Sequence, residues 1–210
     1  EPDAFAQTMR KIAGSGAAVI GGCCGTTPEH IRAMTAVCLE IPYEPAGKKN
    51  LTMVSSYGKT VIFGEESKII GERINPTGKK KFKQALVERD MDYILREGIR
   101  QEDNGAHILD VNVGLPDIDE VSMMKEAVTA LQGVTSLPLQ IDTVDPRAME
   151  EALRVYNGKP MVNSVSGNQE SMDAVFPLIQ KYGGVVVGLT LDETGIPETA
   201  DGRVEIAERI

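Results

Sequence analysis

The sequence predicts an α/β protein made of parallel (β/α)8 (TIM) barrels, both of them incomplete within its 210 residues. Two observations support this fold class. From residue 68 onward, short apolar segments alternate with amphipathic ones, which is the pattern of βαβ units in a parallel sheet. Polar residues also end successive predicted strands, and a barrel gathers its ligand-binding side chains at that mouth. A doubly wound sheet, the other parallel architecture, concentrates such groups at one switch point instead.

The first segment, residues 1–40, contains one helix–strand–helix unit. The helix over residues 3–13 has an apolar face formed by Phe5, Met9 and Ile12. The apolar run of residues 17–20 predicts a buried strand. Pro28 suits the first position of a second helix, and Thr27 suits its cap. Such a unit is too small to bury a core alone, so we expect it to be the end of a larger domain.

Residues 41–67 are expected to form an interdomain linker. Turn-forming and charged residues dominate its first half, namely Pro42, Pro45, Gly47, Lys48, Lys49 and Asn50. A short irregular strand is expected within residues 57–63.

The second segment, residues 68–210, is expected to contain five strand–helix units. The predicted strands are residues 69–71, 108–113, 139–142, 161–164 and 185–191. The predicted helices are residues 91–105, 120–131, 146–156 and 170–182, with a last one starting at 202. Right-handed crossovers make neighbouring strands parallel. These units are fewer than a closed (β/α)8 barrel needs.

The composition argues against several classes of function. The net charge is −9, from 22 Lys and Arg against 31 Asp and Glu, which disfavours binding to nucleic acid. No apolar run approaches the ~20 residues of a membrane span, and the first residues do not resemble a signal peptide. Three cysteines do not make a secreted disulfide framework and indicate a reducing, cytoplasmic compartment. Because the initiator Met is absent, we expect a piece of a longer chain.

Two adjacent cysteines follow the first predicted strand. Flanking glycines let the backbone turn tightly, so the thiolates of Cys23 and Cys24 can both bind one zinc ion. The alternative is a pair of ordinary buried thiols, since free cysteine is among the most buried residue types. Cys38, on the following helix, is expected to be a core thiol, and His30 a surface residue.

Polar side chains also end three strands of the second segment. Asp110 and Asn112 are two residues apart and therefore point to one side of their strand. Asp142 and Asn163 end the next two strands, and we expect all four to face one mouth. The alternative for the first pair is that they bond each other and the neighbouring loop.

The first segment resembles the homocysteine S-methyltransferase family through Gly-Gly-Cys-Cys-Gly-Thr-Thr-Pro at residues 21–28. The resemblance implies that Cys23 and Cys24 bind zinc together with a third cysteine from an earlier strand, which this sequence lacks. It also implies that the zinc holds the homocysteine thiolate.

The second segment resembles the pterin-binding family. The similar motifs, in order, are Gly-Glu-Arg-Ile-Asn-Pro-Thr-Gly (71–78), Leu-Asp-Val-Asn-Val-Gly (109–114), Ile-Asp-Thr (141–143) and Val-Asn-Ser (162–164). The resemblance implies that Asp142 accepts the pterin amide and amino hydrogens in a bidentate pair, and that Asn163 contacts the ring. It places Asp110, Asn112, Gly78, Lys79 and Lys80 at the folate. Glu72 and Asn75 lie near the same mouth and are weaker candidates.

Together the two segments are similar to the family of cobalamin-dependent methionine synthases. That family moves a methyl group from methyltetrahydrofolate through cobalamin, held by a separate cobalamin-binding domain, to zinc-bound homocysteine. Asn163 is the catalytic candidate, because a water that it holds would protonate the pterin.

Alternatives remain. Residues 188–197 are as similar to methyltetrahydrofolate–corrinoid iron–sulfur protein methyltransferases, and dihydropteroate synthases share the pterin pocket. Neither of these has a homocysteine module. The remaining alternative is not an enzyme: it is a fragment that binds a pterin and catalyses no reaction.

Overall fold

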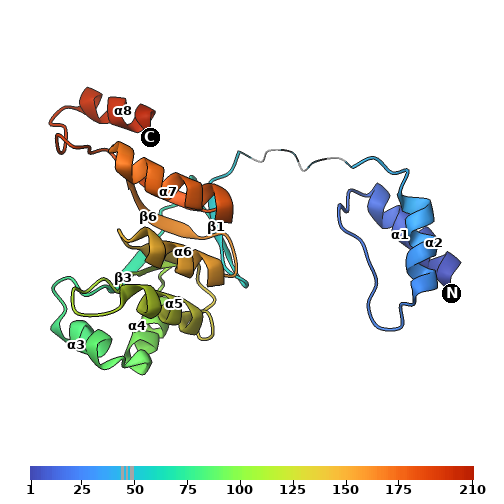
Figure 1. The fold of residues 1–210 in the computed structure, drawn as a ribbon, viewed down its shortest axis with the longest axis horizontal. Helices are drawn as coiled ribbons and strands as arrows, with labels where there is room; N and C mark the ends of the chain where they lie inside the picture. Colours follow the sequence, from blue (N-terminus) through green and yellow to red (C-terminus); the bar gives the residue numbers. More distant parts are fainter. Residues whose placement is uncertain (44, 46, 48–49) are drawn as a thin grey trace. The chain divides into compact units, whose positions relative to one another are not determined.

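The computed structural model describes residues 1–43, 45, 47 and 50–210. The linker prediction for Lys48 and Lys49 lies outside these residues. The chain divides into two compact units, Glu1–Asn50 and Leu51–Ile210, and each is described by itself (Figure 1). Within the described residues, the helices are too short or too polar to cross a lipid bilayer.

The first unit consists of helices α1 (Pro2–Gly14) and α2 (Pro28–Cys38), which pack against each other. Both helices confirm the sequence prediction. The strand predicted at residues 17–20 is wrong, because these residues form no strand and Val19 is 92% exposed. An extended segment needs a neighbouring strand for its backbone hydrogen bonds, and the described part of this unit offers none.

The second unit begins with an antiparallel hairpin of β1 (Met53–Ser55) and β2 (Thr60–Ile62). The sequence assigns these residues to the linker, with one irregular strand. In the structure, Val54 and Val61 instead pack into a buried cluster with Ile108 and Met161 of the main sheet.

Five parallel strands form the main sheet, in the order β3-β4-β5-β6-β7. They are β3 (Ile70–Ile74), β4 (Ile108–Val111), β5 (Leu139–Asp142), β6 (Met161–Ser166) and β7 (Val185–Leu189). The helices are α3 (Lys80–Glu88), α4 (Met91–Asp103), α5 (Glu120–Leu131), α6 (Pro146–Val155), α7 (Gln169–Tyr182) and α8 (Ala200–Arg209). The alternation and strand direction confirm the α/β prediction of an incomplete barrel. Helix α3 is the one element of this region that the sequence analysis missed.

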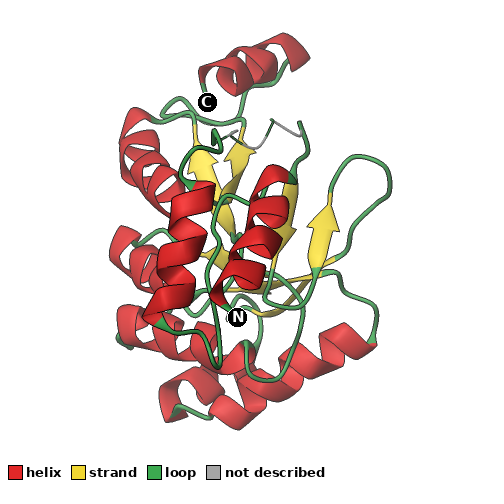
Figure 2. Ribbon diagram, turned by 90° about the vertical axis from the view of Figure 1, so that its right-hand side faces the viewer, coloured by secondary structure: helices red, strands yellow, loops and turns green. Residues whose placement is uncertain are grey.

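The two faces of the main sheet have different partners, because side chains alternate along each strand. Leu109, Ile141 and Val162 lie on the outer face and pack in a continuous apolar core with the helices. Figure 1 shows α4 to α7 side by side in chain order, and Figure 2 draws the strands in yellow and the helices in red. The inner face is apolar where the hairpin covers it and polar toward the carboxyl ends of the strands.

Candidate functional site

The register of the sheet brings the predicted polar residues together on its inner face. Asp110 lies opposite Gln140 on β4 and β5, and Asp142 lies opposite Asn163 on β5 and β6. The expectation that Asp142 and Asn163 share one face is therefore confirmed. We call the group of Asp110, Asn112, Gln140, Asp142 and Asn163 the polar face.

Asn112 follows the end of β4 and fixes the carboxylate next to it. Its Nδ2 donates a hydrogen bond of 2.9 Å to Asp142 Oδ2, and its Oδ1 accepts one of 3.0 Å from the Gly114 N–H. With its donor and its acceptor both engaged, Asn112 orients Asp142. Of the alternative in which Asp110 and Asn112 bond each other and the loop, the structure shows the bond between Asn112 and the loop, while its other partner is Asp142 rather than Asp110.

Asp110 lies deeper than the sequence predicts. Its side chain is only 1% exposed, and Gln140 Nε2 donates a hydrogen bond to its Oδ1. Its other oxygen, Oδ2, has no hydrogen-bond partner among the described residues. Asp110 is thus buried in the polar face, whereas Asp142 and Asn163 are only half-buried.

Burial and like charges perturb both carboxyl groups. Burial raises the pKa of Asp110 to about 7; the Gln140 hydrogen bond opposes the rise, and the charges of Asp142 and Glu72 add to it. Burial also raises the pKa of Asp142, against the hydrogen bond from Asn112 and with the charge of Glu72. Asp142 therefore makes ionisation of Asp110 harder, whereas the side-chain interaction with Asp110 lowers the pKa of Asp142.

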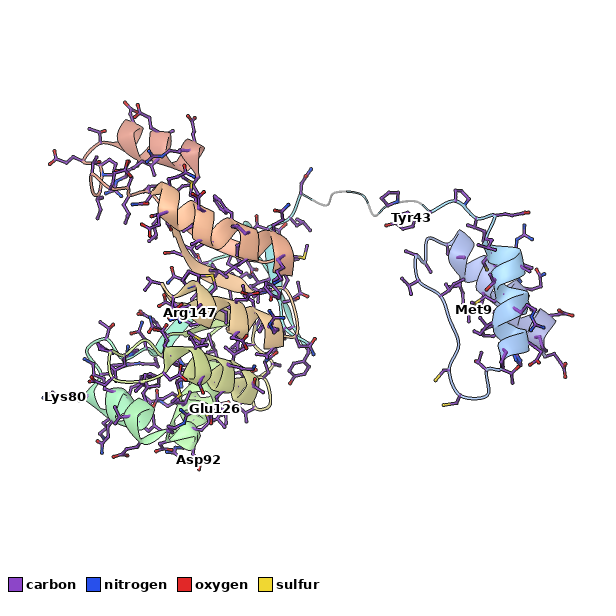
Figure 3. The ribbon with its side chains drawn as sticks, in the orientation of Figure 1. Met9, Tyr43, Lys80, Asp92, Glu126 and Arg147 are labelled. Atoms are coloured by element: carbon purple, nitrogen blue, oxygen red, sulfur yellow. The ribbon has the colours of Figure 1, made fainter. Side chains whose placement is uncertain are left out.

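A cleft of about 680 Å³ opens above Asn112 and Asp142 at the carboxyl ends of β3, β4 and β5. Its walls come from the loops that follow these strands, and its lining includes Pro76, Thr77, Leu115, Ile118, Val144 and Arg147. Figure 3 labels Arg147 at the start of α6. The cleft is large enough for a small heterocyclic molecule and combines apolar walls with a polar floor.

The loop after β3 is ordered by its own residues. Asn75 is 5% exposed, donates a 3.0 Å hydrogen bond to Glu72 Oε1 and accepts one of 2.8 Å from the Thr77 N–H. Asn75 therefore shapes the turn. Gly78 has a φ of +72°, and Lys79 and Lys80 begin α3 just beyond the lining residue Thr77 (Figure 3).

Sequence reasoning missed two side chains of this region. Gln140 stands two residues before Asp142, so strand alternation alone could have placed it on the same face. Thr143 is 4% exposed, donates its hydroxyl to Glu120 and accepts the Asp145 N–H at 3.1 Å, which ties the loop after β5 to the start of α5.

Cys23 and Cys24 lie in the loop between α1 and α2, and both are exposed rather than buried thiols. Their sulfurs are 3.7 Å apart, and the Cys23 N–H donates a 3.0 Å hydrogen bond to Thr26 Oγ1. Hydrogen bonds from the backbone and thiol of Cys24 lower the pKa of Cys23. Cys38 is half-buried on α2, and the His30 ring accepts the Thr27 N–H at 3.3 Å.

The cysteine pair fits two positions of a zinc site. A tetrahedral zinc ion with Zn–S bonds of about 2.3 Å holds two thiolates about 3.8 Å apart. No group of three or more metal-binding side chains occurs among the described residues, so further ligands would come from outside them.

Comparison with known proteins agrees with both units. The profile described as "Homocysteine S-methyltransferase" matches residues 1–38. The methionine synthases of Mycobacterium tuberculosis (strain ATCC 25618 / H37Rv) and Mycobacterium leprae (strain TN) are 33% and 32% identical over the whole chain. The chain spans 18% of the length of each.

Among solved structures, the 7,8-dihydropteroate synthase of Vibrio fischeri ES114 has a TM-score of 0.53 at 18% identity, covering 76% of this chain and 60% of that one. This likeness shows a shared fold. The profile described as "Pterin binding enzyme" matches residues 71–209, which is more than half of the sequence. The chain therefore belongs to the pterin-binding enzyme family.

Proposed function

We propose that this chain is the part of a methionine synthase that binds methyltetrahydrofolate and contributes two zinc ligands to the homocysteine site. The parent enzyme would transfer the methyl group through cobalamin to homocysteine. The observation that carries the proposal is the register of β5 and β6, which sets Asn163 beside Asp142, a residue that lines the cleft. The similarity to methionine synthases along the whole chain supports it.

The polar face suits a pterin because its hydrogen-bond acceptors match the hydrogen-bond donors of the ring. A pterin ring presents an amide N–H beside an amino group, and one carboxylate accepts both in a bidentate pair. Asn112 holds Asp142 in place at 2.9 Å, so the acceptor is oriented before the ligand arrives. The Asn163 amide can donate and accept hydrogen bonds, and would bond the ring nitrogens and oxygen next to it.

Methyl transfer requires that the pterin N5 become a better leaving group. A proton delivered there as the methyl departs achieves this. We infer that Asn163 orders the water that carries this proton. Cobalamin, bound by another domain, would supply the nucleophile that takes the methyl group.

The thiol pair would serve the second half of the reaction. Zinc held by Cys23 and Cys24 would lower the pKa of the homocysteine thiol and keep it nucleophilic near neutral pH. The 3.7 Å separation of the two sulfurs supports this role.

A calorimetric titration with methyltetrahydrofolate tests the folate site. The wild-type chain should bind it, and Asp142→Asn and Asn163→Ala should each weaken binding about tenfold or more, the loss expected for a hydrogen bond to a charged or buried group. Asp117→Asn, an exposed acid near the same mouth, is the matched control and should bind like the wild type. Equal affinity of all four proteins would exclude the polar face as the pterin site.

A further inference from the structure

The interior of the polar face contains two buried atoms that lack partners. Asp110 Oδ2 and Gln140 Oε1 have no hydrogen bond among the described residues, although their side chains are 1% and 5% exposed. A buried polar atom without a partner costs free energy comparable to a lost hydrogen bond. Asp110 Oδ2 therefore needs a hydrogen-bond partner.

The titratable side chains next to Asp110 on the neighbouring strands are all acids. Glu72 approaches from β3 and Asp142 from β5, while the neighbouring side chains on β6, Met161 and Asn163, do not titrate. No lysine, arginine or histidine forms an ion pair with Asp110 in the part of the chain that the structure describes. The charge of an ionised Asp110 would thus be uncompensated.

Asp142 stands two residues after Gln140, the register partner of Asp110, so the two carboxyl groups lie on the same face of neighbouring strands; each also shifts the pKa of the other. Two ionised carboxylates cannot bond, because neither has a hydrogen to donate. One proton between them converts the same contact into an O–H···O⁻ hydrogen bond, which is of the short and strong class. Gln140 already donates to Oδ1 of Asp110, which leaves Oδ2 to carry that proton.

We propose that Asp110 is a positioning residue that keeps its proton up to the neutral range and shares it in a hydrogen bond with the Asp142 carboxylate, so that Asp142 carries the charge that binds the pterin. Asn112 and Asp110 then hold Asp142 from two sides. The raised pKa of Asp110, about 7, agrees with this arrangement. The proposal deepens the folate-site proposal and rests on it for its ligand, but its protonation can be measured without any ligand.

The first test is a ¹³C NMR titration of the aspartate carboxyl carbons in the wild-type protein without ligand. Asp110 should titrate near neutral pH, well above the ordinary 3.8. Titration of Asp110 at or below its ordinary value would overturn the proposal, whether or not the chain binds folate.

The second test is the pH dependence of unfolding, again without ligand. The folded-state pKa of Asp110 lies above the unfolded one, so its contribution to stability is complete below about pH 4 and is lost as the pH rises to about 7. The ratio of the unfolding constants of wild type and Asp110→Asn should therefore rise about tenfold per pH unit across this range. A ratio that stays constant would contradict the proposal.

The third test separates positioning from direct contact. Asparagine can replace the neutral donor, so Asp110→Asn should bind methyltetrahydrofolate within about twofold of wild type, whereas Asp110→Leu should lose about tenfold. Equal losses in both variants would show that the ionised carboxylate touches the ligand, and no loss in either would show that Asp110 does not position Asp142. If wild type does not bind, the folate proposal fails while the two ligand-free tests still decide the state of Asp110.

Discussion

At the scale of single residues, the environment of Asp142 decides what the site can recognise. The carboxylate is half-buried and receives the Asn112 amide at 2.9 Å. Two other acids lie nearby: the charge of Glu72 raises the pKa of Asp142, whereas the side-chain interaction with Asp110 lowers it. A ligand with hydrogen-bond donors relieves this crowding, whereas an anionic group would add to it. The polar face therefore selects for a donor-rich, uncharged ring edge.

This environment gives folate binding a definite dependence on pH. Burial, with the charge of Glu72, raises the pKa of Asp142. Because only the ionised carboxylate accepts two hydrogens, affinity for methyltetrahydrofolate should fall as the pH drops through that raised value. Calorimetric titrations from pH 8 downward measure this loss. Asp142→Asn should bind weakly and show no such loss, and an identical profile in both proteins would mean that another group titrates.

Sequence alone located Asp142 and Asn163 correctly on one face, because strand alternation and parallel register are simple repeating rules. It could not tell that Asp110 is 1% exposed while Asp142 is half-buried. Depth within a site depends on which side chains cover it. Here Gln140 covers Asp110, and this contact depends on the relative register of β4 and β5.

At the scale of elements, the sequence predicted the helices in which apolar residues recur clearly at helical spacing. It failed where the apolar pattern was short or was masked by charged residues. Helix α3 has buried Phe82, Ala85 and Leu86 at helical spacing, but four nearby lysines made the segment look like solvated surface. Residues 17–20 have the composition of a strand and form none. An apolar run becomes a strand only beside a partner strand, which composition cannot reveal.

One side chain bonds both the hairpin and the main sheet. Tyr156, just after α6, accepts the Leu139 N–H at 3.0 Å and donates to the Ser55 carbonyl at 2.9 Å. Tyr156→Phe leaves both backbone groups without partners and should lower the free energy of unfolding by about 1–3 kcal/mol. Urea unfolding measures this change. Tyr57→Phe is the control, since Tyr57 is 59% exposed and should shift stability by less than about 0.5 kcal/mol. Similar effects of both changes would refute this role of Tyr156.

At the scale of the whole molecule, each unit can be judged by the core that it contains. Both apolar clusters of the second unit consist only of residues from 51–210. The first unit leaves large side chains open to solvent, with Val19 92% and Leu39 77% exposed. The folding information of the pterin-binding part is therefore contained in the second unit.

The sequence and the structure place the start of the pterin-binding part at different residues, and this difference can be tested. The sequence places it at residue 68, whereas the structure includes the hairpin from residue 51. The piece 51–210 should unfold at the same temperature as this region of the whole chain, since its core is intact. The piece 68–210 lacks Val54 and Val61, which are 0% and 8% exposed and cover Ile108 and Met161.

Burial of a valine side chain stabilises by about 1.5–3 kcal/mol, so loss of the pair should lower the unfolding free energy of 68–210 by about 3–6 kcal/mol. Scanning calorimetry of both pieces measures the change, and Val54→Ala in 51–210 should give part of it. Equal stability of 51–210 and 68–210 would place the domain boundary where the sequence predicts it. The hairpin would then be an appendage to the sheet, and the inner face would need no cover at its amino-terminal end.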